Sequence, residues 1–185
     1  MVTRIGYQLD NQPTVTDPSR YRKVYTGRME LDQTFTNEEL SSLLTYDHVT
    51  WWPLQQVQVR TGGDGTMEVS AALITANIPW AEFAASVRTY LPKVMPERLP
   101  VYLKGKVDVV GLTEVRLDLD RVEVGRVPLP DSLLTAEGQA QATRYVNDRI
   151  RAIPGLTIRE LTYQEGQVRF QGTFPESFRR ASIAP

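Results

Sequence analysis

Three groups of residues have the chemical types that catalysis requires. Arg116, Asp118 and Asp120 alternate along the chain, so they share one face of an extended strand and could form a carboxylate pair for acid and base chemistry. The sequence also holds a single histidine, His48, and two adjacent serines at positions 41 and 42. No G-x-S-x-G nucleophile motif occurs in the chain. We therefore expect a protein that is not an enzyme, and interpret the aspartate row as the solvated face of a sheet.

The sequence also contains no motif typical of a metal or cofactor site. The cluster Gly62-Gly63-Asp64-Gly65 lacks the Lys and the helix of a phosphate loop, and its residue types favour a hairpin turn. The absence of Cys excludes thiolate metal sites and disulfides, and one histidine is too few for a multi-histidine centre. The net charge of −1 provides no field that would attract nucleic acid. The sequence predicts no metal, no cofactor and no nucleic-acid partner.

Strict alternation of apolar and polar residues over 101–119 predicts two antiparallel strands with one dry and one wet face. Pairing Val109 with Val115, and Val107 with Leu117, keeps the apolar sides together. The apolar phase changes near Arg121, which predicts a bulge that bends the sheet. Beyond it, residues 127–130 read as an extended exit that cannot be a central strand, because it contains two prolines.

Two further hairpins are predicted, over residues 57–73 and 156–174. The second pairs Tyr163 with Val168 and Leu161 with Phe170, apolar to apolar. A short strand is expected where the apolar residues Met29, Leu31 and Phe35 occur.

Helix signals occur at three places. Thr36 followed by Glu39 forms a capping box, which predicts the start of a short helix. A second helix is predicted over 80–91, whose apolar face is Trp80, Phe83, Ala84, Val87 and Leu91. The longest helix is predicted over 136–152, with the stripe Ala136, Ala140, Thr143, Val146 and Ile150.

These elements define an α+β fold. We expect residues 1–25, which are polar and contain two prolines, to form an extended arm or linker, and residues 26–185 to form a single domain. The apolar strand face and the stripe on the 136–152 helix both need a dry partner. The sequence therefore predicts a strongly curved antiparallel sheet wrapped around that helix, with short additional helices.

The adjacent tryptophans Trp51 and Trp52 allow two interpretations. They cannot both face one core if the segment is extended, so one could lie at a membrane interface or at the rim of a ligand pocket. In the other interpretation, one tryptophan lies in the core and the second covers a helix end.

Two motifs resemble those of the small bacterial lipid-binding proteins related to tubular lipid-binding (TULIP) domains. One is the helix start Phe35-Thr36-Asn37-Glu38-Glu39-Leu40-Ser41-Ser42-Leu43-Leu44, and the other is the exit Val122-Glu123-Val124-Gly125-Arg126-Val127-Pro128-Leu129-Pro130. The last hairpin, with Glu165-Gly166 and Gly172, fits the same order, and the similarity covers roughly residues 28–174. The segment 80–91 has no counterpart that we can identify in that family.

The resemblance implies that the chain binds a lipid or other apolar ligand without catalysis, near a membrane surface. It also implies an extracytoplasmic protein tethered to the membrane, although no signal sequence or membrane anchor is present in this sequence. The ligand-binding residues expected for an elongated apolar cavity are Trp51, Trp52, Trp80, Phe83, Val87, Leu91, Val146 and Ile150. The alternative is a structural or interaction module, a surface subunit of an assembly, with a fully packed core, a protein partner and no ligand.

Overall fold

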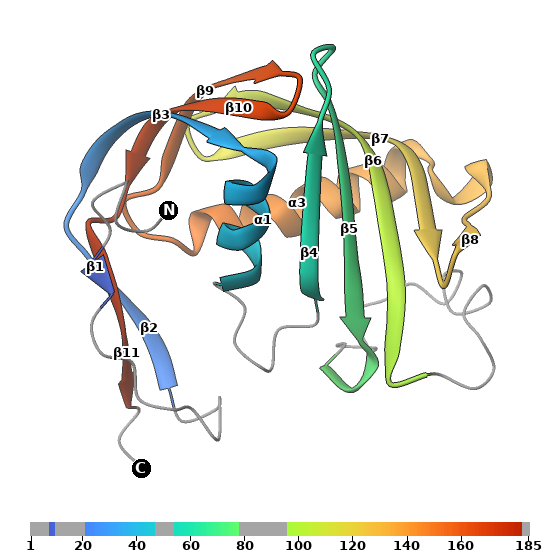
Figure 1. Ribbon diagram of the computed structural model, residues 1–185, viewed down its shortest axis with the longest axis horizontal. Helices are drawn as coiled ribbons and strands as arrows, with labels where there is room; N and C mark the ends of the chain where they lie inside the picture. The colour runs from blue at the N-terminus through green and yellow to red at the C-terminus, as the bar shows by residue number, and fades with distance from the viewer. Residues whose placement is uncertain (1–7, 10–20, 47–53, 78–95, 183–185) are drawn as a thin grey trace.

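The computed structural model describes residues 8–9, 21–46, 54–77 and 96–182 (Figure 1). These residues form an α+β fold with two antiparallel sheets, two α-helices and a smaller third sheet. The elements are β1 Gln8–Leu9, β2 Tyr21–Thr26, β3 Met29–Thr36, α1 Asn37–Tyr46, β4 Leu54–Thr61, β5 Thr66–Ile74, β6 Arg98–Gly111, β7 Glu114–Val124, β8 Val127–Pro128, α3 Ala136–Arg151, β9 Thr157–Gln164, β10 Gln167–Phe174 and β11 Ser177–Ser182, with 3-10 turns η2 Thr75–Asn77 and η3 Asp131–Leu133.

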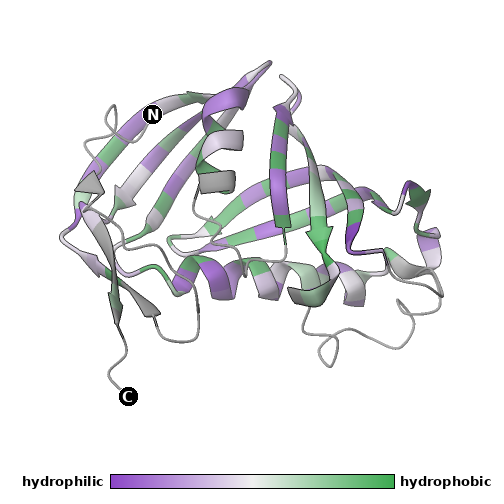
Figure 2. Ribbon diagram, turned by 60° about the horizontal axis from the view of Figure 1, so that its bottom comes forward, coloured by the Kyte–Doolittle hydropathy of each residue, from purple (hydrophilic) through white to green (hydrophobic). Residues whose placement is uncertain are grey.

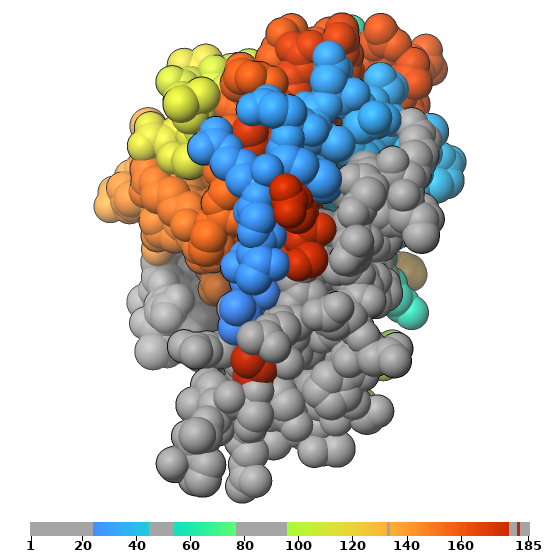
Figure 3. Space-filling model, turned by 90° about the vertical axis from the view of Figure 1, so that its left-hand side faces the viewer, coloured from blue at the N-terminus to red at the C-terminus, as the bar shows by residue number. Residues whose placement is uncertain are grey.

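The largest sheet has five strands in the order β4-β5-β6-β7-β8, all antiparallel. A second antiparallel sheet has the order β3-β10-β9, and the small third sheet has the order β1-β11-β2. Strand β2 pairs with β11, and its residues 21–26 overlap the end of the predicted arm. Figure 3 shows the blue N-terminal strands and the red C-terminal strands side by side on one face.

The predicted strand registers are confirmed. Val109 pairs with Val115 and Val107 with Leu117 in the β6–β7 hairpin. In the β9–β10 hairpin, Tyr163 pairs with Val168 and Leu161 with Phe170. Strand β8 lies at the outer edge of its sheet, as the two prolines around it require.

The predicted bulge near Arg121 is also confirmed. Lys104 pairs with Arg121, whereas Gly105 pairs with Leu119, so Asp120 is an extra residue on β7. Figure 1 shows β6 and β7 bending, from the upright direction of β4 and β5 to a course across the top of the molecule. The bulge therefore bends the hairpin locally, as bulges do.

The prediction of one strongly curved sheet wrapped around the 136–152 helix is wrong. Neither antiparallel sheet is strongly curled, and the predicted hairpins divide between the two sheets. Where the β6–β7 hairpin meets β9, the contact includes the bond from the Ile158 amide to the Leu112 carbonyl, at 2.7 Å, and the bond from the Tyr163 hydroxyl to the Val107 carbonyl, at 2.9 Å. Because β9 and β6 are not neighbours in any sheet, the two sheets remain separate.

One face of the five-stranded sheet is apolar across its strands. Val59, Val69, Leu103 and Val122 are register partners from β4 to β7, and they form one row on this face. Green and purple residues alternate along these strands in Figure 2. On the opposite face, Asp118 and Asp120 are exposed, in keeping with a solvated face.

Helix α1 connects the cores of the two antiparallel sheets. Leu40 packs against the buried pair Leu31 and Phe35 of β3, and also against the buried cluster of Val57, Val59 and Ala71. The helix begins with the predicted capping box. The Thr36 amide donates to Glu39 Oε2 at 3.1 Å, and the Glu39 amide donates to Thr36 Oγ1 at 3.3 Å.

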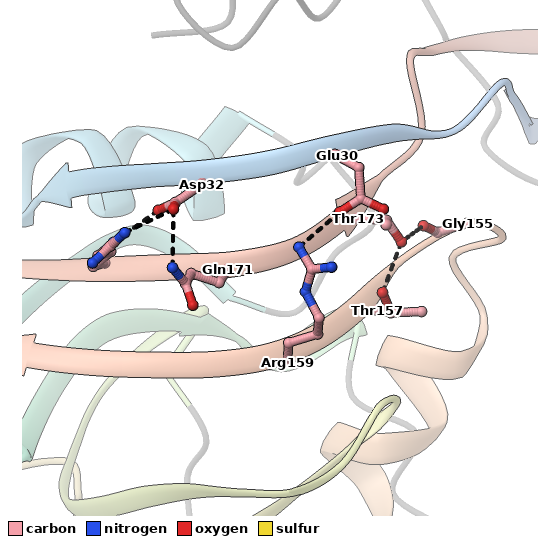
Figure 4. Close-up of polar contacts among 8 residues, drawn as sticks. Glu30, Asp32, Gly155, Thr157, Arg159, Gln171 and Thr173 are labelled. Atoms are coloured by element: carbon pink, nitrogen blue, oxygen red, sulfur yellow. Dashed lines mark hydrogen bonds and ion pairs between the residues drawn. The ribbon is translucent and has the colours of Figure 1, made fainter.

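In the sheet β3-β10-β9, charged side chains form ion pairs and hydrogen bonds with one another (Figure 4). Arg169 donates two hydrogen bonds to Asp32, each at 2.7 Å, and Gln171 donates a third at 2.9 Å. Arg159 pairs with Glu30 at 2.7 Å on the same sheet. Deeper in the sheet, the hydroxyl of Thr173 donates to the Gly155 carbonyl at 2.7 Å and is bonded to the Thr157 hydroxyl at 2.8 Å. These groups explain a stable sheet without requiring a ligand.

The carboxyl group of Asp32 gives a pH prediction. The hydrogen bonds from Arg169 and Gln171 lower the pKa of Asp32 from 3.8 to about 2. Because the folded pKa lies below the unfolded one, the carboxylate stabilises the fold above about pH 4, and this stabilisation is lost as the pH falls through about 2. Carbon-detected NMR of the Asp32 carboxyl should show a titration midpoint near pH 2. The Tm of D32N should fall less than that of the parent protein between about pH 4 and pH 2, because the variant has no carboxylate to protonate at this position. A midpoint near 4 would contradict the prediction.

Candidate binding surface

Helix α3 is attached to the edge of β7 by hydrogen bonds between side chains and backbone. Three polar side chains spaced four residues apart face this edge, and each accepts a backbone N–H: Asn147 from Val115 at 2.9 Å, Thr143 from Leu117 at 3.2 Å and Gln139 from Leu119 at 3.3 Å. Asn147 is buried and also donates to the Val115 carbonyl at 3.0 Å. Spacing of i, i+4, i+8 places these residues on one helix face, and alternate strand residues present their N–H groups to the same side.

Helix α1 covers the opposite edge of the same sheet in the same way. Ser41 Oγ accepts the Val59 amide at 2.8 Å, and Asn37 Oδ1 accepts the Thr61 amide at 3.1 Å. Asn37 Oδ1 also accepts the Thr61 hydroxyl, at 3.0 Å. Side chains of the two helices therefore occupy N–H groups along the free edges of β4 and β7, which protects these segments from the strand addition that open edges invite.

The apolar face of the five-stranded sheet is incompletely covered within the described residues. Val115 is buried at 2% exposure, but the other apolar residues of the bent part of the β6–β7 hairpin are only partly buried. They are Leu103, Val107, Val109, Leu117 and Leu119. We define these five residues as the apolar surface and treat it as the candidate binding surface.

The structure places two of the predicted ligand-binding residues. Val146 and Ile150 are partly buried on α3, the helix that packs at the β7 edge rather than inside a curved sheet. The others, Trp51, Trp52, Trp80, Phe83, Val87 and Leu91, lie outside the described residues, as does the whole predicted 80–91 helix and His48. The apolar cavity expected beside that helix therefore stays a prediction.

Sequence reasoning missed the polar rows that attach the helices. The apolar stripe of α3 was expected to face the sheet, yet Gln139, Thr143 and Asn147 form the row that bonds to β7. Thr143 is part of the predicted stripe, but the prediction was that it packs against the sheet, whereas the structure shows it accepting a hydrogen bond. A row of small polar residues at four-residue spacing on a helix that follows a hairpin was the available signal, both here and for Asn37 and Ser41 of α1.

A hollow of about 480 Å³ lies between α1 and β4. Polar side chains from both elements line it, and one of them, Gln56, has a φ of 53°, in the left-handed region. The pairing of β4 with β5 shifts by one residue between Gln55 and Gln58, so Gln56 belongs to a bulge. The hollow opens to solvent and is distinct in character from the apolar surface.

Two observations on the described residues concern proton and metal chemistry. Burial raises the pKa of the Tyr163 hydroxyl to about 12, so it stays protonated at neutral pH and serves to bridge the two sheets. In these same ranges, no group of three or more acidic or histidine side chains converges as metal ligands would. The helices described there also include none with the length and apolar character of a membrane span.

No protein-family model matches the chain, and neither a curated protein nor a solved structure is significantly similar to it. The fold is therefore defined only as α+β with two antiparallel sheets, and the function has to be argued from the chain's own residues.

Proposed function

We propose that the protein binds a lipid or another apolar ligand without catalysis, close to a membrane surface. The observation that supports this function is the incomplete cover over the apolar surface, formed by five partly buried residues on β6 and β7. Apolar area that a domain's own helices leave accessible gains free energy when a ligand covers it. The extracytoplasmic, tethered location is part of the proposal and rests on the resemblance to lipid-binding domains alone.

The free energy gained by burying methylene groups favours an acyl chain as the ligand. Each methylene that leaves water contributes about 0.8 kcal/mol, so a chain with about ten buried methylenes would gain roughly 8 kcal/mol before ordering costs. The apolar surface runs along the β6–β7 hairpin, and its elongated course suits a long, thin ligand better than a compact one. Affinity should therefore rise with acyl length.

The sealed edges bear on the rival function, a structural or interaction module. An open sheet commonly recruits a protein partner by adding a strand of that partner to its edge. Side chains of α1 and α3 already occupy N–H groups along β4 and β7, so this route is blocked there. A protein partner that docked on the face of this sheet would compete with a lipid for the same apolar surface.

A titration with saturated fatty acids of increasing length tests the proposal. We expect calorimetry to show binding that tightens steeply between chains of about eight and sixteen carbons, because each added methylene contributes to the buried area. V107T, which places a hydroxyl on the apolar surface, should weaken binding about threefold to tenfold. The matched control is V110T on the same strand, because Val110 is 55% exposed on the other side and should leave affinity unchanged.

Undetectable binding at every chain length would overturn the lipid proposal and leave the interaction module standing. Equal losses in V107T and V110T would also contradict it, because they would show that binding does not use the apolar surface.

A further inference from the structure

The hollow between α1 and β4 has walls of mixed polar chemistry. Glu38 and Ser42 come from one side of α1. The wall from β4 includes the exposed residues Gln56, Gln58 and Arg60, and the buried residues Val57 and Val59 between them. Its volume, about 480 Å³, falls within the range of small-ligand sites, roughly 300–1,000 Å³. This site is separate from the apolar surface on β6 and β7.

One wall is held rigid by the bonds that attach α1 to β4. Asn37 also lines the hollow, and its Oδ1 is fixed by two bonds from Thr61, at 3.1 and 3.0 Å. Among the contacts of the described residues, none occupies its Nδ2, so the amide keeps two donors for another partner. A donor whose orientation is set before binding loses little freedom when a ligand arrives.

The opposite wall contains the backbone outlier Gln56. A φ of 53° is uncommon for a residue other than glycine, and such conformations are found preferentially at binding and catalytic sites. Glycine would adopt this conformation without strain, yet the chain has a long amide side chain there. That combination of a strained backbone and a polar side chain, beside a hollow, points to a role in recognition.

The chemistry of the walls selects a class of ligand. The amides supply donors and acceptors, and Glu38 and Arg60 supply one negative and one positive charge, so the walls carry no net charge. A phosphate would meet the Glu38 carboxylate, and an acyl chain would leave the amides without partners. A neutral polyhydroxyl group offers a donor and an acceptor at every hydroxyl, and fits both kinds of wall.

We propose that the hollow between α1 and β4 binds a neutral polyhydroxyl group, such as a sugar ring. The group could belong to a free saccharide or to the headgroup of a glycolipid. The proposal does not depend on the apolar surface, so it stands or falls separately from the proposed lipid function.

The test is an NMR titration of the full chain, labelled with nitrogen-15, with a panel of methyl glycosides. Backbone and side-chain amide signals of Asn37, Gln56 and Gln58 should shift as the sugar is added, whereas inorganic phosphate should leave them unchanged. An octyl glycoside of the same sugar distinguishes the sources. Binding more than tenfold tighter than that of the methyl glycoside indicates a glycolipid headgroup, and equal binding indicates a free saccharide.

Variants decide whether the hollow is responsible. R60Q and Q58A should each weaken binding about threefold to tenfold, the equivalent of one hydrogen bond. R98Q is the matched control, because Arg98 is likewise an exposed strand arginine with no ion pair among the described residues, and it lies outside the hollow. Q56G should weaken binding while raising Tm, since glycine removes the strain together with the amide.

The proposal would be overturned if no glycoside shifts these signals, or if phosphate alone does. Equal effects of R60Q and R98Q would also overturn it. Unchanged binding in Q56G together with unchanged binding in Q58A would also overturn it, because neither amide of the β4 wall would then contribute to recognition.

Discussion

Replacing Gly105 with alanine is expected to lower the free energy of unfolding by about 3 kcal/mol or more, because the new methyl group has no space. An added Cβ would collide with the Asp118 carbonyl oxygen and would lie 2.9 Å from Leu119 Cα. Both neighbours are backbone atoms of β7 at the bulge, so they cannot move aside as a side chain would. Urea denaturation of G105A and the parent protein measures the difference.

Gly111 provides the matched control on the same strand. A Cβ added there would meet the side chain of Glu114 at 3.5 Å or more, which is ordinary contact. G111A should therefore change stability by less than about 1 kcal/mol. Similar stabilities for G105A and the parent would show that β6 and β7 do not approach each other this closely at the bulge.

The second large effect is expected at Asn147. N147L keeps the branched shape of the side chain but removes the acceptor for the Val115 amide and the donor to its carbonyl, at 2.9 and 3.0 Å. Each buried backbone group left without a partner costs about 1–3 kcal/mol, so we expect the free energy of unfolding to fall by roughly 3 kcal/mol. Denaturant unfolding of the variant measures this change.

Arg144 gives the comparison for Asn147, because it is an exposed residue on the same helix. R144A should change stability by less than about 0.5 kcal/mol. Hydrogen exchange gives a second reading. The Val115 amide should exchange faster in N147L, and unchanged exchange would contradict the role assigned to Asn147.

The parts of the fold that the sequence predicted are those fixed by neighbouring residues. The capping box of Thr36 and Glu39 needs only four residues, and it forms as expected. Register in a hairpin follows from alternation and a short turn, and the β6–β7 and β9–β10 pairs confirm it. The bulge at Asp120 was visible because the apolar phase slips there.

The parts that the sequence did not predict depend on contacts between distant segments. Helix α3 was placed against a sheet face because hydrophobic periodicity reports burial and says nothing of hydrogen bonds to a strand edge. Asn147 and Val115 are 32 residues apart, and their types give no sign of pairing. The hollow beside α1 was also missed. It is lined in part by Gln56, whose positive φ could not be foreseen, because glutamine has no preference for that conformation.

The pairing of β2 with β11 has a mechanical consequence. Tyr21 is the register partner of Ser182, and the pairs run antiparallel from there to Thr26 and Ser177. A force that pulls Tyr21 and Ser182 apart would therefore load the ribbon at one end, and its hydrogen bonds would break one after another rather than together. Under such a force this ribbon would open like a zipper.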